Sequence, residues 1–167
     1  METADFLDAT RRDGLAFAEA CSGAGLSTPV PSCPGWNVAD LLWHLTEAHH
    51  FWHTIVGERR DSWDGFERLQ RPADDELLAG YRSGLEATLD VLSAADPAHP
   101  NWTWTTDHTA GWVIRRMAHE TAMHRWDAEG AAGTDAPIDA ELASDGIDEF
   151  LSWFISDAAE GAAPVGG

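Results

Sequence analysis

The stretch RRMAHETAMHRWDAE, residues 115–129, carries the pattern that decides the fold. With the residues just before it, it places five side chains at steps of four, three, four and three, so that all share one face of an α-helix: Val113, Met117, Glu120, His124 and Asp127. The face begins apolar, as a core face does, and continues polar. Burying a carboxylate and an imidazole costs free energy unless a partner stabilises them. We therefore predict a core helix with a metal ion as the partner of its polar end.

Helical spacing recurs on both sides of this stretch. Five helices are expected: residues 4–22 with Thr3 as N-cap, 38–57 with Asn37 as N-cap and Asp40 three residues later, 74–95, about 112–129 ended by Gly130, and a fifth from Pro137 through Leu142, Ile147, Phe150, Leu151 and Phe154. The proline-rich segments 27–36 and 97–111 predict loops, and the charged residues 58–73 predict a long connection. No convincing pair of strands is indicated. The expected fold is all-α, a four-helix bundle with an additional C-terminal helix.

Length and composition indicate one folded domain. The chain has 167 residues, of which 44% are hydrophobic and nine are tryptophan, enough to build one sizeable core. We expect a metal-binding helical domain over residues 1–160 and a flexible tail over residues 161–167.

Charge and cysteine content limit the partners and the compartment. The chain has 29 acidic and 10 basic residues, a formal charge of -19. This charge repels nucleic acid and anionic membranes, so neither is expected as a partner. Cys21 and Cys33 form no CxxC pair, the N-terminal residues do not resemble a signal peptide, and no apolar run approaches the length of a membrane span. A cytoplasmic protein is predicted.

A third metal ligand can come from the helix over residues 38–57. His44 lies at the edge of its apolar stripe, and zinc sites with an open position commonly use three nitrogen or oxygen ligands. A rival pair, His49 and His53, has the same i, i+4 spacing on that helix, although His53 is expected to face solvent. Spacing alone leaves both sets open. It also leaves open a solvated polar stripe that holds no metal.

Two segments resemble a known family. PSCPGWNVADLLWHL (residues 31–45) and RRMAHETAMHRWDAE, followed by PIDAELASDGIDEFL, resemble the N-terminal domain of the mycothiol-dependent maleylpyruvate isomerase family, within the DinB-like superfamily. The resemblance implies that His44, Glu120 and His124 hold a divalent cation. We expect zinc, although nickel and iron also suit such ligands. Many family members continue into a small second domain, and we expect that this chain lacks it.

The resemblance also implies a chemistry. The thiol of mycothiol would bind the metal as a thiolate and then either isomerise a conjugated double bond or be transferred to a small electrophile. The partners would be that thiol and an electrophile, with a homodimer left open. The alternative is a non-catalytic bundle that stores or senses a metal or small molecule.

Several other side chains are candidates for supporting roles. Asp127 can accept the second ring N–H of His124, or instead form a surface ion pair. Arg116 and Arg125, and also Arg115, can bind carboxylates of the thiol or substrate, or simply neutralise nearby acids.

The loop and helix around residues 31–52 contribute apolar candidates. Trp36, Trp43 and Trp52 can line the pocket or pack in the core, and packing is favoured for Trp52. Cys33 is expected to be a buried structural thiol.

Overall fold

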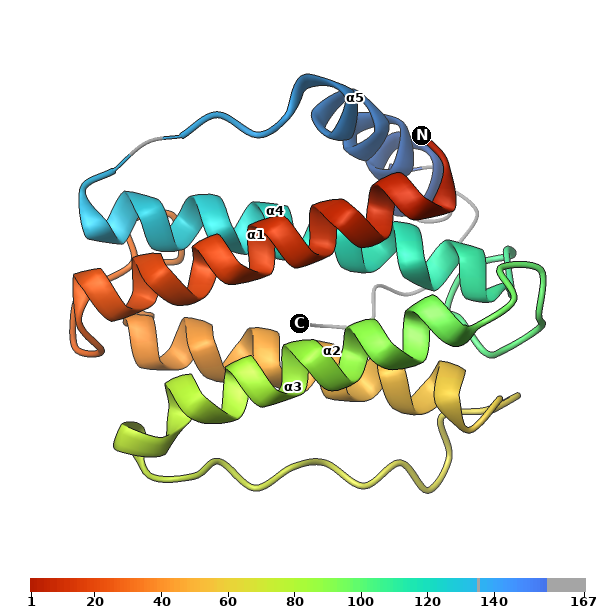
Figure 1. Ribbon diagram of the computed structural model, residues 1–167, viewed down its shortest axis with the longest axis horizontal. Helices are drawn as coiled ribbons and strands as arrows, with labels where there is room; N and C mark the ends of the chain where they lie inside the picture. The colour runs from red at the N-terminus through yellow and green to blue at the C-terminus, as the bar shows by residue number, and fades with distance from the viewer. Residues whose placement is uncertain (135, 156–167) are drawn as a thin grey trace.

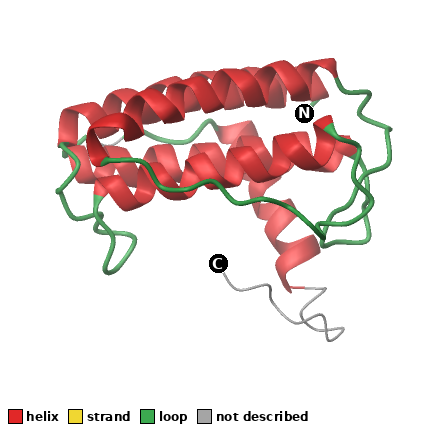
Figure 2. Cartoon of the chain, turned by 90° about the horizontal axis from the view of Figure 1, so that it is seen from below, coloured by secondary structure: helices red, strands yellow, loops and turns green. Residues whose placement is uncertain are grey.

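The structure, a computed structural model, describes residues 1–134 and 136–155. Its elements are α1 (Thr3–Ala24), α2 (Val38–Gly57), α3 (Asp74–Ala94), α4 (Ala110–Ala132), α5 (Ala140–Glu149) and the π-helical segment η1 (Phe150–Ile155). Within these residues no strand is formed, and β-pairing is confined to two isolated bridges (Figure 2). The prediction of an all-α four-helix bundle with an additional C-terminal helix is confirmed.

The four long helices form two layers (Figure 1). Helix α1 packs against α4, and α2 packs against α3. Residues 58–73 run back along the length of the bundle, so α2 and α3 point in the same direction. Helix α5 packs on α4 near the end of the bundle where α1 and α4 begin. The long connection expected over residues 58–73 is therefore what allows two consecutive helices to be parallel.

Local side-chain capping fixes the beginning of α2. The backbone N–H of Asp40 donates to Asn37 Oδ1 at 3.0 Å, and the N–H of Asn37 donates to Asp40 Oδ2 at 3.1 Å. This reciprocal capping box confirms the predicted start and provides partners for two helix-end N–H groups. By contrast, Thr3 was wrongly expected to be the first cap, because Glu2 takes that position and Asp5 accepts its N–H.

Helix α4 is longer than its sequence pattern indicates. It begins at Ala110 because Thr109 Oγ1 accepts the N–H of Trp112 at 3.2 Å. Gly130 was expected to end the helix, and this is wrong. The helix continues to Ala132, and Gly133 ends it with a φ of 73°, a left-handed conformation that favours glycine.

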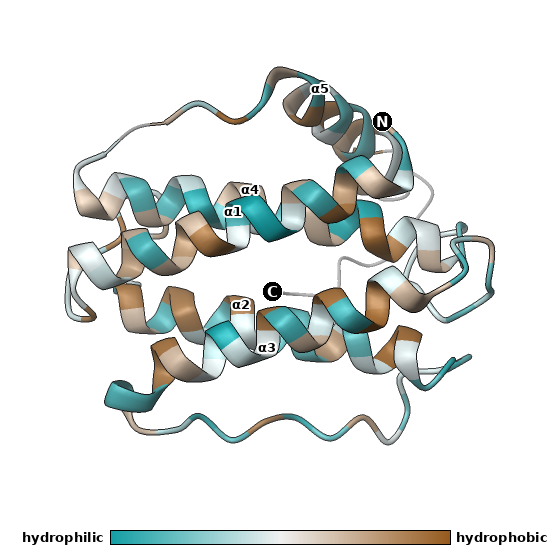
Figure 3. Ribbon diagram, in the orientation of Figure 1, coloured by the Kyte–Doolittle hydropathy of each residue, from teal (hydrophilic) through white to brown (hydrophobic). Residues whose placement is uncertain are grey.

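Two apolar clusters fill the bundle, one toward each end. The first includes Trp52, Trp112 and Met117, and the second includes Leu45 and Ala128. Along every long helix hydrophobic positions alternate with hydrophilic ones (Figure 3). On α4, Glu120 and His124 are partly buried, with side chains 22% and 15% exposed.

The C-terminal elements expose much of their apolar surface. Leu142 is buried, whereas the other apolar residues expected on the fifth helix are exposed: Ile147, Phe150, Leu151 and Phe154. The predicted end of the domain at residue 160 and the predicted tail over 161–167 lie outside the described residues. In the described part of the chain, none of the helices has the length and apolar character needed to cross a membrane.

Candidate metal centre

Three side chains from two helices, α2 and α4, converge at one point. His44 Nε2 on α2 and His124 Nε2 on α4 each lie 3.1 Å from the same oxygen, Glu120 Oε1. The two imidazole rings are 4.8 Å apart and nearly perpendicular. One ligand atom from each of the three residues lies within 4.8 Å of the others. The structure therefore brings together the three residues predicted as ligands.

The donor set fits a single divalent cation. Two imidazole nitrogens and one carboxylate oxygen are ligands that zinc commonly takes, with bonds of about 2.0–2.1 Å. In a tetrahedral site such bonds separate neighbouring ligand atoms by roughly 3.3 Å, and the two His–Glu separations are 3.1 Å. Both His–Glu pairs are therefore close to the spacing that one shared ion requires, and a fourth position would remain open.

The charges of these groups are strongly coupled. Burial raises the pKa of Glu120, but hydrogen bonds with His124 and His44 and the charge of Arg116 outweigh it, and the pKa lies well below its usual value. Burial lowers the pKa of His124, but hydrogen bonds to Asp127 and Glu120 raise it to about 9. Glu120 is therefore a carboxylate at neutral pH, as a metal ligand must be.

Asp127 holds the other side of the His124 ring. Its Oδ2 lies 2.8 Å from His124 Nδ1, so it can accept the ring N–H and leave Nε2 facing Glu120. Burial raises the pKa of Asp127, and hydrogen bonds with His124 and Ser32 outweigh that effect and lower it. This is the geometry expected of a carboxylate that orients a ligand.

The loop before α2 supports both histidines. Ser32 Oγ donates to Asp127 Oδ1 at 2.5 Å, and Cys33 Sγ lies 3.7 Å from Asp127 Oδ2. The Trp36 ring packs on His44 at 5.0 Å between centroids. Cys33 is half-buried, and burial is the main cause that raises its pKa, which makes it a poor nucleophile. The PSCPGW loop thus places groups behind both imidazoles.

The rival histidine pair has other surroundings. His49 is fully buried, and its Nε2 lies 3.0 Å from Thr121 Oγ1. His53 was expected to face solvent, but it is partly buried and its Nδ1 lies 3.1 Å from Thr88 Oγ1. Neither ring has a carboxylate partner of the kind that His44 has in Glu120. Among the described residues, the one group of acids, histidines and cysteines that could hold a metal is His44, Glu120 and His124.

Two of the three candidate arginines pair with acids, which is the alternative to ligand binding that the sequence left open. Arg125 is buried, pairs with Asp13 and Glu129, and donates to the Ala136 carbonyl. Arg115 binds two acids of α5. Because its donors serve α1 and the segment before α5, Arg125 has a structural role, and its prediction as a thiol-binding residue finds no support in these contacts.

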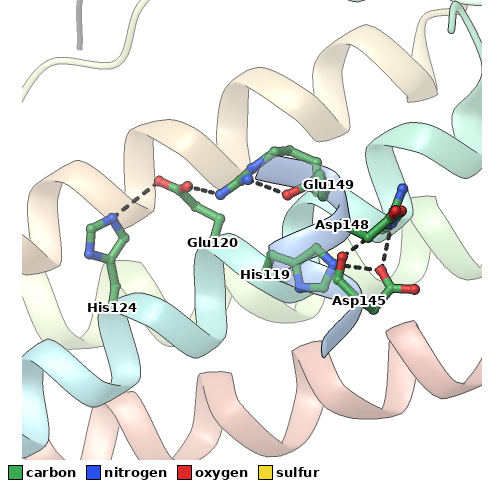
Figure 4. Close-up of polar contacts among 8 residues, drawn as sticks. His119, Glu120, His124, Asp145, Asp148 and Glu149 are labelled. Carbon is green, nitrogen blue, oxygen red and sulfur yellow. Dashed lines mark hydrogen bonds and ion pairs between the residues drawn. The ribbon is translucent and has the colours of Figure 1, made fainter. Parts of the chain in front are cut away.

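Arg116 is the arginine that contacts the candidate ligands. It lies one turn before Glu120 on α4, and its Nη2 donates to Glu120 Oε2. Its Nη1 donates to Glu149 Oε2 on α5 at 2.5 Å. Figure 4 shows the resulting row of contacts from His124 through Glu120 to Glu149. Arg116 is thus occupied by two carboxylates.

Sequence reasoning missed two parts of this site. Ser32 lies 95 positions before Asp127, and Glu149 lies 33 positions after Arg116. Neither pairing follows from helical spacing, which relates residues within a turn or two. The position of Ser32 in a loop with three prolines was a signal that could have suggested a fixed role for its hydroxyl. No feature of the sequence indicated the contact of Glu149.

A family comparison agrees with this arrangement. Residues 7–129 match the model of the mycothiol maleylpyruvate isomerase N-terminal domain, a DinB-like helical domain, and this span includes all three candidate ligands. Comparison with curated proteins and with solved structures gave no match. Because the match covers most of the sequence and the fold is helical throughout its described part, the chain belongs to the mycothiol maleylpyruvate isomerase N-terminal domain family.

Proposed function

We propose that this protein binds one divalent cation, zinc by expectation, and uses it to activate the thiol of mycothiol. The observation that carries the proposal is the meeting of His44, Glu120 and His124 atoms within 4.8 Å of one another, inside the matched domain. A surface cluster of acids would not have this mixture of donors. Three protein ligands leave one position for a sulfur atom, as in catalytic zinc sites.

The protein's own residues would hold and orient this centre. Glu120 would bring the negative charge, and His44 and His124 would bind through ring nitrogens, with the proton on His124 Nε2 released when the metal binds. Asp127 accepts the Nδ1–H of His124, which leaves Nε2 free to bind. A bound zinc ion favours the thiolate form of a thiol ligand at neutral pH. The protein surface around these ligands would bind the electrophile.

The family description supports a small electrophilic substrate. The activated sulfur could add reversibly to a conjugated double bond, with cis–trans isomerisation as the result, or remain bonded to the electrophile in an S-transfer. Both reactions would need the same thiolate, which a metal ion held by His44, Glu120 and His124 would favour. The contacts of Arg116 and Arg125 do not favour them as binding groups for mycothiol, because both already pair with carboxylates.

Free cysteines support a reducing, cytoplasmic setting for this chemistry. Cys21 and Cys33 are both unpaired. Burial raises the pKa of Cys21 to about 12, so its thiol stays protonated and unreactive. Neither protein thiol would compete with the added thiol for the electrophile.

The test is metal content followed by activity. Protein purified without added metal is analysed for bound elements, and thiol consumption is then measured with a panel of electrophiles, with and without a chelator. We expect about one zinc per chain and thiol consumption that the chelator abolishes. Glu120→Gln should lose both, whereas Glu86→Gln, which alters a carboxylate in an exposed ion pair with Arg11, should keep both.

Two outcomes would contradict this function. A wild-type protein without bound metal refutes the metal centre itself. A protein that retains zinc but consumes no thiol with any electrophile refutes the enzyme and supports a metal-binding module instead.

A further inference from the structure

We propose that Arg116 is a positioning residue that aims the Glu120 carboxylate at the metal, and that Glu149 on α5 holds Arg116 in place for this task. The C-terminal helix then belongs to the metal centre, although it lies beyond the matched residues 7–129. This inference rests on the proposed function, because it assigns a role around the same metal.

The first support is how the two oxygens of Glu120 divide their contacts. Oε1 faces both imidazoles, and Oε2 accepts from Arg116. The last torsion of a glutamate side chain is broad, so an unrestrained carboxylate can turn freely. A donor fixed on Oε2 removes that freedom and keeps Oε1 directed at the position between the histidines. The bond from Arg116 also occupies Oε2, so that Glu120 binds the ion through Oε1 alone and not through both oxygens.

The second support is how firmly Arg116 itself is held. Its side chain is 14% exposed, and its Nη1 donates to a Glu149 side chain that is only 1% exposed. The guanidinium carbon lies 5.6 Å from the centre of the Phe154 ring in η1, within the range of a cation–π contact. The planar guanidinium is therefore fixed by α5 and η1 at the same time as it binds Glu120.

The third support is the poor satisfaction of Glu149. Its Oε1 is buried and has no hydrogen-bond partner among the described residues. A buried carboxylate with one partner adds little net stability compared with an apolar side chain of the same size. Stability therefore does not explain why a carboxylate is buried at position 149. A role in fixing the orientation of Arg116 does.

The neighbouring arginine offers a matched control. Arg115 also joins α4 to α5, through Asp145 Oδ1 at 2.6 Å and Asp148 Oδ2 at 2.8 Å (Figure 4). Its hydrogen bonds go to α5 alone. Loss of either arginine should loosen α5, but only loss of Arg116 should release Glu120.

The experiment compares Arg116→Gln with Arg115→Gln in the full chain. Zinc affinity is measured by competition with a chromophoric chelator, melting temperature by circular dichroism, and ligand geometry by the visible absorption of the cobalt(II)-loaded protein. Removing a group that orients a ligand typically weakens metal affinity by about 10- to 100-fold. We expect that loss and an altered cobalt spectrum for Arg116→Gln, and zinc affinity within about twofold of wild type for Arg115→Gln.

Two further variants separate orientation from folding. Arg116→Lys keeps the positive charge but lacks the two parallel donors of the guanidinium, and it should bind zinc more tightly than Arg116→Gln but less tightly than the wild type. Glu149→Gln should weaken zinc binding less than Arg116→Gln does but in the same direction, while Asp145→Asn should not. If Arg116→Gln does not fold, the pair Glu149→Gln and Asp145→Asn decides the question.

Equal zinc affinities and equal cobalt spectra for the two arginine variants would overturn the inference, because both arginines would then only fasten α5. That outcome leaves the proposed function intact, since the wild type still binds zinc. A wild-type protein that binds no zinc overturns the proposed function and this inference together.

Discussion

Helix α2 presents two histidines to α4, and they meet neighbouring residues of different chemistry. His44 Nε2 lies 3.1 Å from a carboxylate oxygen of Glu120, and His49 Nε2 lies 3.0 Å from the hydroxyl of Thr121. Both contacts join the same two helices. A shift of one residue along α4 thus separates a charged partner from a neutral one.

The difference teaches that the partner, more than burial, decides what a buried imidazole can do. Burial lowers the pKa of His49 to about 4, because its partner does not compensate for lost hydration. His124 is mostly buried, with a side chain that is 15% exposed, yet its carboxylate neighbours raise its pKa to about 9. An imidazole beside carboxylates is in an environment that favours a cation, whether a proton or a metal ion. His49 is in an environment that favours a neutral ring.

The largest expected effect comes from breaking each of these histidine contacts in turn. His124→Ala should reduce bound zinc from about one ion per chain to almost none, because two remaining ligands do not form a catalytic-type site. His49→Gln should keep the zinc, since the Gln amide can still bond to Thr121. Elemental analysis after desalting measures both. If His49→Gln lost its zinc and His124→Ala kept it, the metal would be bound by the rival pair, His49 and His53.

The comparison can be sharpened through the carboxylate that orients His124. Asp127→Asn keeps the shape but exchanges one acceptor oxygen for a donor, and zinc affinity should fall by about 10- to 100-fold. Asp13→Asn is the matched control, because Asp13 is also a buried acid but pairs with Arg12 and Arg125. Chelator competition should show wild-type affinity for the control. Equal losses in both variants would mean that general destabilisation is responsible.

The neutral ring of His49 should appear in the pH dependence of stability. Its pKa is about 4 in the folded protein and near 6.5 in the unfolded chain, so the unfolded chain binds the extra proton more readily. Stability is fully present above about pH 6.5 and is lost as pH falls toward 4. Between pH 7 and pH 5 the wild type should lose about 2 kcal/mol more than His49→Gln.

Urea denaturation of metal-free protein at the two pH values measures this loss. Both proteins contain the same other acids, so those contributions cancel in the difference. Identical losses in the wild type and the variant would show that His49 does not titrate as its burial requires.

The smallest expected effect tests the loop behind the site. Ser32→Ala removes one hydrogen bond to Asp127, worth about 1 kcal/mol, and should weaken zinc binding by roughly fivefold. Ser62→Ala removes a hydroxyl that accepts only the Asp64 N–H in the long connection, and it should change nothing. Isothermal titration with zinc distinguishes the two. An effect of Ser32→Ala equal to that of Asp127→Asn would make the loop, rather than the carboxylate, the main support.

The sequence predicted much of the fold because the signals were local. The Asn37 and Asp40 capping box needs residues three positions apart, and α2 has the predicted bounds of 38–57. Helix ends were less predictable where two glycines competed. Gly130 and Gly133 are both plausible stops, and the structure gives the left-handed conformation to Gly133.

The candidate site was only partly predictable for the same reason. Glu120 and His124 share a face of one helix, which spacing alone establishes. His44 was selected over His49 by resemblance, because both lie near the apolar stripe of α2. Arg125 follows His124 directly, and no local rule indicated that it would pair with Asp13 on α1 instead.

The sequence by itself determined the helices, the loops that separate them and the polar face of α4, since capping and helical periodicity act over three or four residues. Only the tertiary structure decided that Glu120 faces His44 while Thr121 faces His49, and that Glu149 reaches Arg116. The physical reason is that the rotation and axial offset of packed helices depend on the whole core. A shift of one residue in that packing changes which side chains meet.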